Sequence, residues 1–181
     1  MAKKSYPVDV IEIRQLSASE GRRYVGALAD VLLDCVKGGA SVSFMSSLEK
    51  SEAEAFFENA LTDVERGNRV LLAAFVDSTL TGTVQVITSM PPNQPHRADV
   101  AKLLVTTAAR GQGIGGLLMA HAENAARQAG KSLLVLDTAT GSAAERLYAR
   151  LGWTKVGIIP QYAVYPDGSW CDTTYFWKRL D

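Results

Sequence analysis

The stretch ARGQGIGG, residues 109–116, carries more chemical information than any other part of this 181-residue chain. Four of its eight residues are glycines, which let the backbone turn tightly and approach a ligand closely, so that several N–H groups can point at one anion. Arg110 adds a positive charge that suits phosphate oxygens. A helix beginning here would add the positive end of its dipole. The stretch therefore predicts a turn that binds a diphosphate group.

Regular elements flank this turn on both sides. The apolar run Ala98–Val105 predicts a strand before it, and the Ala-rich run Gln112–Ala129, ended by Gly130, predicts a helix after it. Ser132–Asp137 then predicts a short buried strand. The order is that of a strand-helix-strand crossover, whose two strands run parallel.

The amino-terminal third predicts one strand and two helices. Residues 8–16 alternate apolar and polar side chains, as a half-buried strand does. Ser17 and Glu20 form a capping-box pattern that starts a helix, which the two glycines at 38 and 39 end. After a loop over residues 40–45, a second Ser-x-x-Glu pattern predicts a helix from about Ser46 to Gly67.

The remaining segments predict antiparallel strands and one further helix. Arg69–Val76 and Leu80–Ser89 are typical of a β-hairpin, and the proline-rich residues that follow are typical of a loop. Ser142 with Glu145 starts the last helix, which is expected to end near residue 151. Strands over residues 154–159 and 173–178, linked through a turn at 166–168, close the chain.

Composition and charge exclude several classes of protein. Nineteen basic residues balance nineteen acidic ones, so no net field draws the chain to nucleic acid or to an anionic membrane. No apolar run is long enough for a transmembrane helix or a signal peptide. Cys35 and Cys171 are far apart and show no metal-ligand or redox spacing. We therefore expect one cytoplasmic domain over residues 1–181 that binds a small molecule.

Two cofactor classes and one purely structural explanation fit the glycines. Gly111, Gly113 and Gly116 satisfy the dinucleotide-binding pattern G-x-G-x-x-G, and Asp137 lies at a suitable distance to reach a ribose hydroxyl. However, the residues after Asp137 end in an antiparallel pair, whereas a doubly wound fold continues with strand-helix units. A merely tight helix entry is the structural alternative, but so many glycines cost more backbone entropy than a turn requires.

The pattern Arg110-x-x-Gly113-x-Gly115, after a strand and opening a helix, resembles the acyl-CoA pyrophosphate loop of the GNAT superfamily of N-acetyltransferases. The segment LYARLGW, residues 147–153, resembles the second conserved segment of that superfamily. The resemblance implies a single α/β domain, with a mixed and largely antiparallel sheet of about seven strands flanked by about four helices. It implies acetyl-CoA as co-substrate, no metal, and cofactor contacts from Leu103, Leu104, Val105, Arg110, Gly111, Gln112, Gly113, Ile114, Gly115, Gly116, Ser142 and Tyr148.

The resemblance also suggests catalytic groups. Tyr148 occupies the position where these enzymes commonly place a tyrosine beside the CoA sulfur, and a phenol is matched to a thiolate leaving group. Its alternative role is an aromatic packed under the last helix. Asp137 is the first candidate for the general base, or for binding the substrate ammonium, or for capping the turn that follows. Asp99 is the second candidate; His96 and His121 are weaker, and neither has metal-ligand neighbours.

The acceptor is expected to be a small primary amine, with an amino-acid-like or dipeptide-like toxin or antibiotic as the preferred class. Segments 38–45, 109–115, 136–145 and 161–168 resemble a toxin-inactivating acetyltransferase of the same superfamily. An acceptor carboxylate would need donors, for which Ser41, Ser43, Arg97 and Tyr162 are candidates. Other small amines and protein lysine are the next acceptors in order. An NAD-binding oxidoreductase or a non-catalytic acyl-CoA sensor are the alternative functions, and monomer and homodimer both stay open.

Overall fold

The computed structural model describes residues 10–180 and contains one seven-stranded sheet in the order β1-β2-β3-β4-β5-β7-β6. The strands are β1 (Ile11–Leu16), β2 (Arg69–Val76), β3 (Thr79–Ile87), β4 (Arg97–Val105), β5 (Leu133–Ala139), β6 (Thr154–Val164) and β7 (Trp170–Arg179). The helices are α1 (Ala18–Arg23), α2 (Val25–Lys37), α3 (Lys50–Glu65), α4 (Ile114–Gln128) and α5 (Ala143–Arg150). The predicted single-domain α/β fold with a mixed seven-stranded sheet is confirmed.

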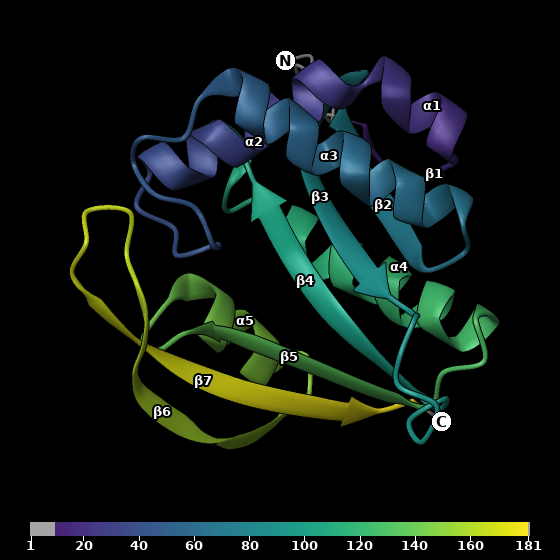
Figure 1. Cartoon of the computed structure of the whole chain (residues 1–181), viewed down its shortest axis with the longest axis vertical. Coiled ribbons are helices and arrows are strands. Elements are labelled where there is room, and N and C mark those ends of the chain that lie inside the picture. Colours follow the sequence, from purple (N-terminus) through teal and green to yellow (C-terminus); the bar gives the residue numbers. More distant parts are fainter. Residues whose placement is uncertain (1–9, 181) are drawn as a thin grey trace, which may run out of the picture.

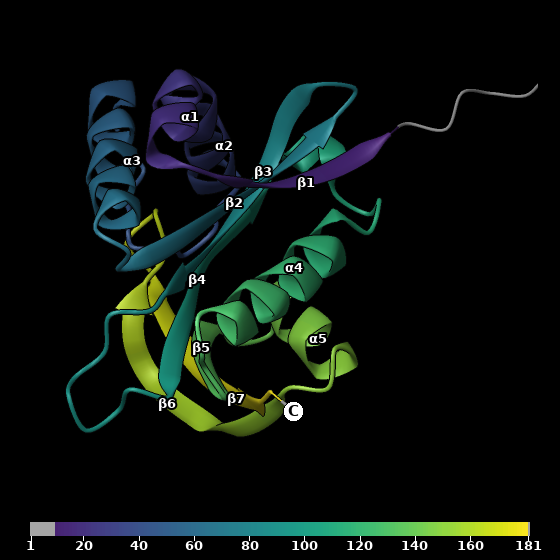
Figure 2. The ribbon, with the colours of Figure 1, turned by 90° about the vertical axis from the view of Figure 1, so that its right-hand side faces the viewer.

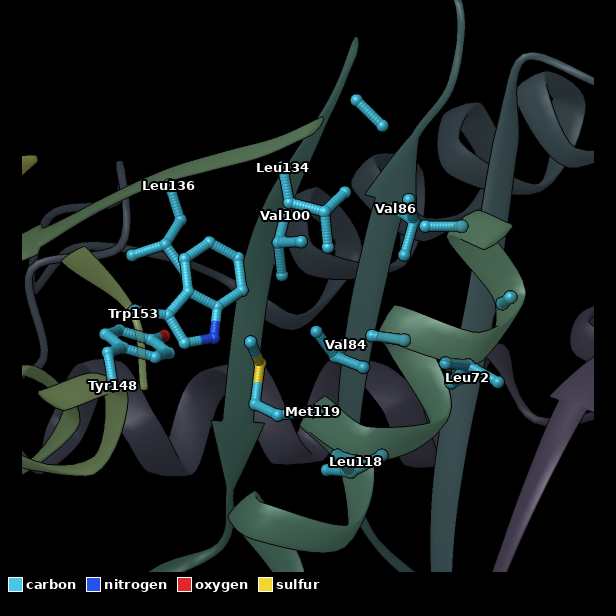
Figure 3. Close-up of a cluster of buried hydrophobic side chains, with 14 of the residues drawn as sticks. Leu72, Val84, Val86, Val100, Leu118, Met119, Leu134, Leu136, Tyr148 and Trp153 are labelled. Carbon is cyan, nitrogen blue, oxygen red and sulfur yellow. The ribbon is translucent and has the colours of Figure 1, made fainter. Parts of the chain in front are cut away.

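Helices cover both faces of the sheet. In Figure 2, α1, α2 and α3 lie on one side of the strands, and α4 and α5 lie on the other. Each face has its own buried core, because the strand residues alternate between the two sides. Leu71, Ala73 and Phe75 of β2 pack toward α2 and α3, whereas Leu72 and Ala74 belong to the core under α4. Figure 3 shows the second core, where Leu118 and Met119 of α4 approach the strands.

One strand pair decides where the molecule opens. Among the strands of residues 10–180, β4 and β5 are the sole parallel neighbours, and they pair only over Arg97–Asp99 and Leu133–Val135. Beyond these residues the two strands diverge (Figure 1). A dinucleotide-binding doubly wound fold requires a run of parallel strands, so that alternative does not fit this sheet.

The first predicted helix is in fact two helices. Ser17 forms the predicted capping box with Glu20, but α1 ends at Arg23 and α2 begins at Val25. Tyr24 leaves the helical backbone at φ −110° and ψ 7°, and its ring packs edge-on against Phe75 of β2, 5.2 Å away. This tertiary contact overrides the local preference for one continuous helix, so residues 10–180 contain five α-helices instead of about four.

The second helix begins four residues later than predicted. α3 starts at Lys50, and its capping box is formed by Glu49 and Glu52, with the Glu49 N–H donating to Glu52 Oε2 at 3.0 Å. Ser46 lies three residues before the N-cap Glu49, and its N–H donates to the carbonyl of Pro166 at 3.1 Å. The loop before α3 is therefore held against the turn between β6 and β7.

Both β6 and β7 are longer than predicted, and the first strand begins at Ile11, with residues 8–9 outside the described range.

Candidate active site

A cleft of about 1070 Å³ opens where β4 and β5 separate. Its floor comes from the second half of β4 and the end of β5. One side is formed by the glycine-rich turn and by α5, and the other by segments 38–45 and 162–165. Four parts of the chain, over residues 35–45, 100–116, 137–150 and 162–173, thus surround one space.

The glycine-rich turn presents backbone to this cleft. Gly111 and Gly113 have φ values of 81° and 84°, in the left-handed region that favours glycine, and Gly113 is the N-cap of α4. A Cβ added to Gly111, Gly113 or Gly116 would meet no atom within 4 Å, so this surface is open. Gly115 has a different role, since a Cβ there would lie 3.1 Å from Leu147 of α5. An anion can therefore approach the free N–H groups at the start of α4.

Almost all residues predicted to contact the cofactor lie together. Gln112 is exposed and does not line the cleft. The cleft is lined by the other eleven, namely Leu103, Leu104, Val105, Arg110, Gly111, Gly113, Ile114, Gly115, Gly116, Ser142 and Tyr148.

The Arg110 side chain is directed back toward its own strand. Its Nε donates to the carbonyl of Val105 at 3.1 Å, and its Nη2 lies 3.8 Å from the Sγ of Cys35. The same Val105 carbonyl accepts from Cys35 Sγ at 3.5 Å. The guanidinium is thus engaged at the end of β4, and the positive potential at the turn comes first from the backbone N–H groups and the α4 dipole.

Tyr148 lies on α5, beneath the cleft, and is 5% exposed. Its ring lies beside that of Trp153 (Figure 3). The Tyr148 ring centroid lies 6.0 Å from that of Trp153 and 5.9 Å from that of Phe176. Burial raises the pKa of the phenol, and the charge of Asp137 raises it further. The hydroxyl therefore stays protonated at neutral pH, as a proton donor must. Tyr148 is both a core residue and a cleft residue, so its two predicted roles are compatible.

Ser142 positions α5 as its N-cap. Its Oγ accepts from the N–H of Glu145 at 3.1 Å, as predicted. The reciprocal half of the capping box is absent, because the Glu145 carboxylate accepts from the N–H of Gly141 instead. Lys155 also donates to this carboxylate, at 3.1 Å. These contacts fix the start of the helix that carries Tyr148.

Asp137 lies near the end of β5 and lines the cleft. Although its side chain reaches solvent, the walls of the cleft partly desolvate it, which raises its pKa; the charge of Lys102 opposes that rise. Asp99, the second candidate base, does not line the cleft and is paired with Arg97 at 2.6 Å. His96 and His121 are exposed and also lie outside the cleft. Of the two carboxylates, Asp137 alone lies where an acceptor amine could reach it.

The model of the acetyltransferase (GNAT) family matches residues 38–153, which include the glycine-rich turn and Tyr148. The chain belongs to the GNAT acetyltransferase family. It is accordingly an acetyl-CoA-dependent N-acetyltransferase.

Solved structures of GNAT-like proteins share this fold across almost the whole chain. yncA of Salmonella typhimurium, whose structure contains acetyl-CoA as cofactor, has a TM-score of 0.78 and 21% identity, with 95% of each chain covered. An N-acetyltransferase of Staphylococcus aureus Mu50 has a TM-score of 0.79 and 18% identity, covering 95% of this chain and 99% of the other. A ribosomal-protein-alanine N-acetyltransferase of Brucella melitensis has a TM-score of 0.77 and 22% identity, covering 93% and 99%.

The cleft of this GNAT enzyme fits the co-substrate of the family. The open cradle at Gly111, Gly113 and Gly116 suits a diphosphate, and acetyl-CoA would supply an activated thioester to the same cleft. Leu103 is the β4 residue best placed to offer backbone groups, because it has no partner in the register with β3, whereas the Val105 carbonyl already accepts from Arg110 and Cys35. Among residues 10–180, no three His, Cys, Asp or Glu side chains are grouped to hold a metal, and no helix there is long and apolar enough to cross a membrane.

Sequence reasoning missed two charged residues of the cleft, Lys102 and Arg150. Lys102 lies on β4 and lines the cleft, where its Nζ donates to the Oγ of Ser43 at 3.1 Å. In the sequence it reads as an ordinary polar position within an apolar strand, so no local signal identifies it. Of the donors that were predicted for an acceptor carboxylate, Arg97 lies outside the cleft, and Ser41 donates to the carbonyl of Val164 at 3.0 Å. Ser41, Ser43 and Tyr162 all line the cleft.

Proposed function

We propose that this enzyme transfers the acetyl group of acetyl-CoA to the primary amine of a small molecule by direct attack, with Asp137 as general base and Tyr148 as general acid. The observation that carries the proposal is that both side chains line the one cleft onto which the glycine-rich turn opens.

Each group has a protonation state suited to its task. Asp137 accepts the proton that the amine loses as its nitrogen bonds to the carbonyl carbon. Its raised pKa brings a carboxyl closer to neutral pH, which makes it a stronger base than an exposed aspartate. Tyr148 donates its proton to the sulfur as the C–S bond breaks, and its burial keeps it protonated until then. Both the glycine cradle and Ser142, which caps the helix of Tyr148, serve to position the reacting groups.

We place the acceptor at the side of the cleft formed by segments 38–45 and 162–165, and the shape of that side supports a small acceptor. Hydrogen bonds connect the two loops that form this side: Ser41 donates to the Val164 carbonyl at 3.0 Å, and the Ser46 N–H donates to the Pro166 carbonyl at 3.1 Å. Loops joined in this way narrow the access of an extended peptide. The resemblance of segments 38–45, 109–115, 136–145 and 161–168 to the tabtoxin resistance protein further favours an amino-acid-like or dipeptide-like amine, such as a toxin or antibiotic.

A cytoplasmic location is part of the same proposal. Cys35 and Cys171 are both free and buried, which suits a reducing compartment.

A thiol-release assay with acetyl-CoA tests the proposed function. The acceptors are amino acids, dipeptides, polyamines, aminoglycosides and a histone-tail peptide. A ribosomal-type peptide that begins with alanine is added, because the Brucella protein is described as a ribosomal-protein-alanine N-acetyltransferase. We expect the highest kcat/KM with an amino-acid-like or dipeptide-like amine. A tenfold preference for either peptide would contradict a small-molecule acceptor, and CoA binding without release of thiol for any amine would favour a non-catalytic sensor.

A further inference from the structure

Lys102 occupies a bulge in β4 beside the cleft. Thr83 of β3 pairs with Leu104 and Gln85 pairs with Ala101, so that Lys102 and Leu103 together lie opposite the single residue between them on β3. Lys102 has a φ of 55°, in the left-handed region, where glycine is the residue without strain. A lysine in such a position costs backbone strain, which points to a use for its side chain.

The partner of Lys102 is strained in the same way. Ser43 has a φ of 75° and accepts the 3.1 Å hydrogen bond from the Lys102 ammonium. The donor and the acceptor of one hydrogen bond thus both adopt a backbone conformation that is uncommon outside glycine. Both side chains line the cleft, on the side formed by segments 38–45 and 162–165.

The ammonium of Lys102 is partly buried without a countercharge in contact. No carboxylate of residues 10–180 lies within 4.0 Å of its Nζ, and the ring of Phe56 lies 5.9 Å away. Arg69, the nearby cation that acts on it, is itself paired with Asp63 at 3.0 Å. Burial lowers the pKa of the Lys102 ammonium, and the charge of Asp137 opposes that change. A desolvated, unpaired cation of this kind favours the binding of an anion.

The charges of Lys102 and Asp137 complement those of a zwitterion. They act on each other electrostatically across the cleft, yet they form no ion pair within 4.0 Å. If they were in contact, they would neutralise each other and leave a polar but uncharged wall. Because they are separated, a molecule that carries an amine and a carboxylate can satisfy both at once.

Building on the acetyl-transfer function proposed above, we propose that Lys102, held by Ser43, is the residue that binds the carboxylate of a zwitterionic acceptor and so directs its amine toward Asp137. Lys102 is therefore a specificity-determining residue, distinct from the groups that move protons. The acceptor class is that of amino acids and short peptides with a free carboxylate, and the corresponding amides and decarboxylated amines are poor substrates.

Matched pairs of acceptors test this assignment. Amino acids and dipeptides with a free carboxylate are compared with their carboxamides, using wild type and the variants Lys102→Met, Lys102→Arg and Lys102→Gly. Methionine is an unbranched, uncharged side chain one heavy atom shorter than lysine, arginine retains the charge, and glycine removes the side chain while relieving the strain at φ 55°. Two readouts are taken: kcat and KM from thiol release, and the rise in Tm caused by each acceptor in the presence of CoA, which does not depend on turnover.

We expect the methionine and glycine variants to raise KM for the carboxylate form by roughly 10- to 100-fold, as for a lost charge-assisted hydrogen bond, and to change KM for the amide little. KM for acetyl-CoA is unchanged, and the arginine variant recovers part of the carboxylate preference. An equal rise in KM for the carboxylate and the amide forms would overturn the assignment, since Lys102 would then act only through Asp137. So would a wild-type enzyme that does not distinguish the two forms in either readout. If CoA-bound wild type prefers the carboxylate form in the Tm measurement but acetylates no amine, the anion subsite stands and the proposed acetyl transfer fails.

Discussion

Asp99 of β4 and Val135 of β5 form the last pair in the parallel section of the sheet, and the cleft begins directly beyond them. Hydrogen bonding between the strands stops there, so the ends of both strands can present backbone and side chains to a ligand instead of to each other. Lys102 on one strand and Asp137 on the other then face a common space. The site of this GNAT enzyme is thus a consequence of incomplete strand pairing.

Binding of acetyl-CoA is expected to depend on Gly113. A Gly113→Val variant must place a β-branched residue at φ 84°, and its side chain would extend into the open cradle. We expect the rise in Tm that acetyl-CoA causes in wild type to be abolished. Gly130→Val is the matched control, since Gly130 has φ 72° and a Cβ there also meets nothing, but it lies outside the cleft. If both variants keep the full ligand-induced shift, the cofactor binds elsewhere.

A substitution at Gly116 also tests whether acetyl-CoA binds at the glycine-rich turn, and it introduces no backbone strain. It lies in the first turn of α4, its φ is not positive, and a Cβ there meets no atom within 4 Å. Leucine is a better helix former than glycine by about 0.5–1 kcal/mol, so Gly116→Leu should keep or raise the Tm of the free protein. Its side chain would nevertheless fill the cradle, and we expect Kd for acetyl-CoA to rise at least tenfold in calorimetry. An unchanged Kd would place the diphosphate away from this turn.

Removal of the Tyr148 hydroxyl should affect turnover and little else. We expect Tyr148→Phe to lower kcat by roughly 10²–10⁴-fold, the usual range for a lost general acid, with binding of acetyl-CoA nearly unchanged. The ring contacts with Trp153 and Phe176 are retained, so the Tm should stay close to that of wild type. Tyr24→Phe, outside the cleft, is the control for tyrosine loss in general. Turnover within a factor of two of wild type would assign Tyr148 to the core alone.

The pH profile should report the interaction between Lys102 and Asp137. At saturating acceptor, kcat is expected to rise with pH as Asp137 loses its proton, above the ordinary range of an aspartate, because burial raises its pKa. The positive charge of Lys102 opposes that rise, so Lys102→Met should move the acidic limb to higher pH. Asp137→Asn should lower kcat and remove the limb. A limb at the same pH in wild type and Lys102→Met would show that the two charges do not interact.

Asp137 is also expected to reduce the stability of the folded protein at neutral pH. A carboxyl whose pKa is raised by folding binds its proton more tightly in the native state than in the unfolded state. The free energy of unfolding therefore decreases as pH rises from the unfolded pKa through the folded one. Asp137→Asn lacks this decrease, so the Tm of the variant should rise relative to that of wild type as pH increases above the ordinary pKa of an aspartate. If the Tm values of the two proteins changed in parallel with pH, the raised pKa of Asp137 would be contradicted.

Local chemistry made much of the fold predictable. Four glycines within residues 109–116 are typical of a tight turn that can approach a ligand closely. Ser17 and Ser142 cap helices through contacts that span only three residues. The errors occurred where distant contacts override such local preferences. Tyr24 interrupts a helix because its ring packs on Phe75, and Ser46, whose N–H is bonded to the Pro166 carbonyl, lies three residues before Glu49, the N-cap of α3.

The sequence by itself therefore determined the order of the elements, the glycine-rich turn and the identity of Tyr148 and Asp137 as candidates, since each depends on residue types at short spacing. Only the tertiary structure decided which charged groups share the cleft. Arg110 turns back to the Val105 carbonyl, and Arg97 pairs with Asp99, whereas Lys102 is brought beside Ser43 by a bulge and by a loop 59 residues away. A side chain's direction depends on strand register and on neighbours that are distant in the sequence, and no local pattern encodes either.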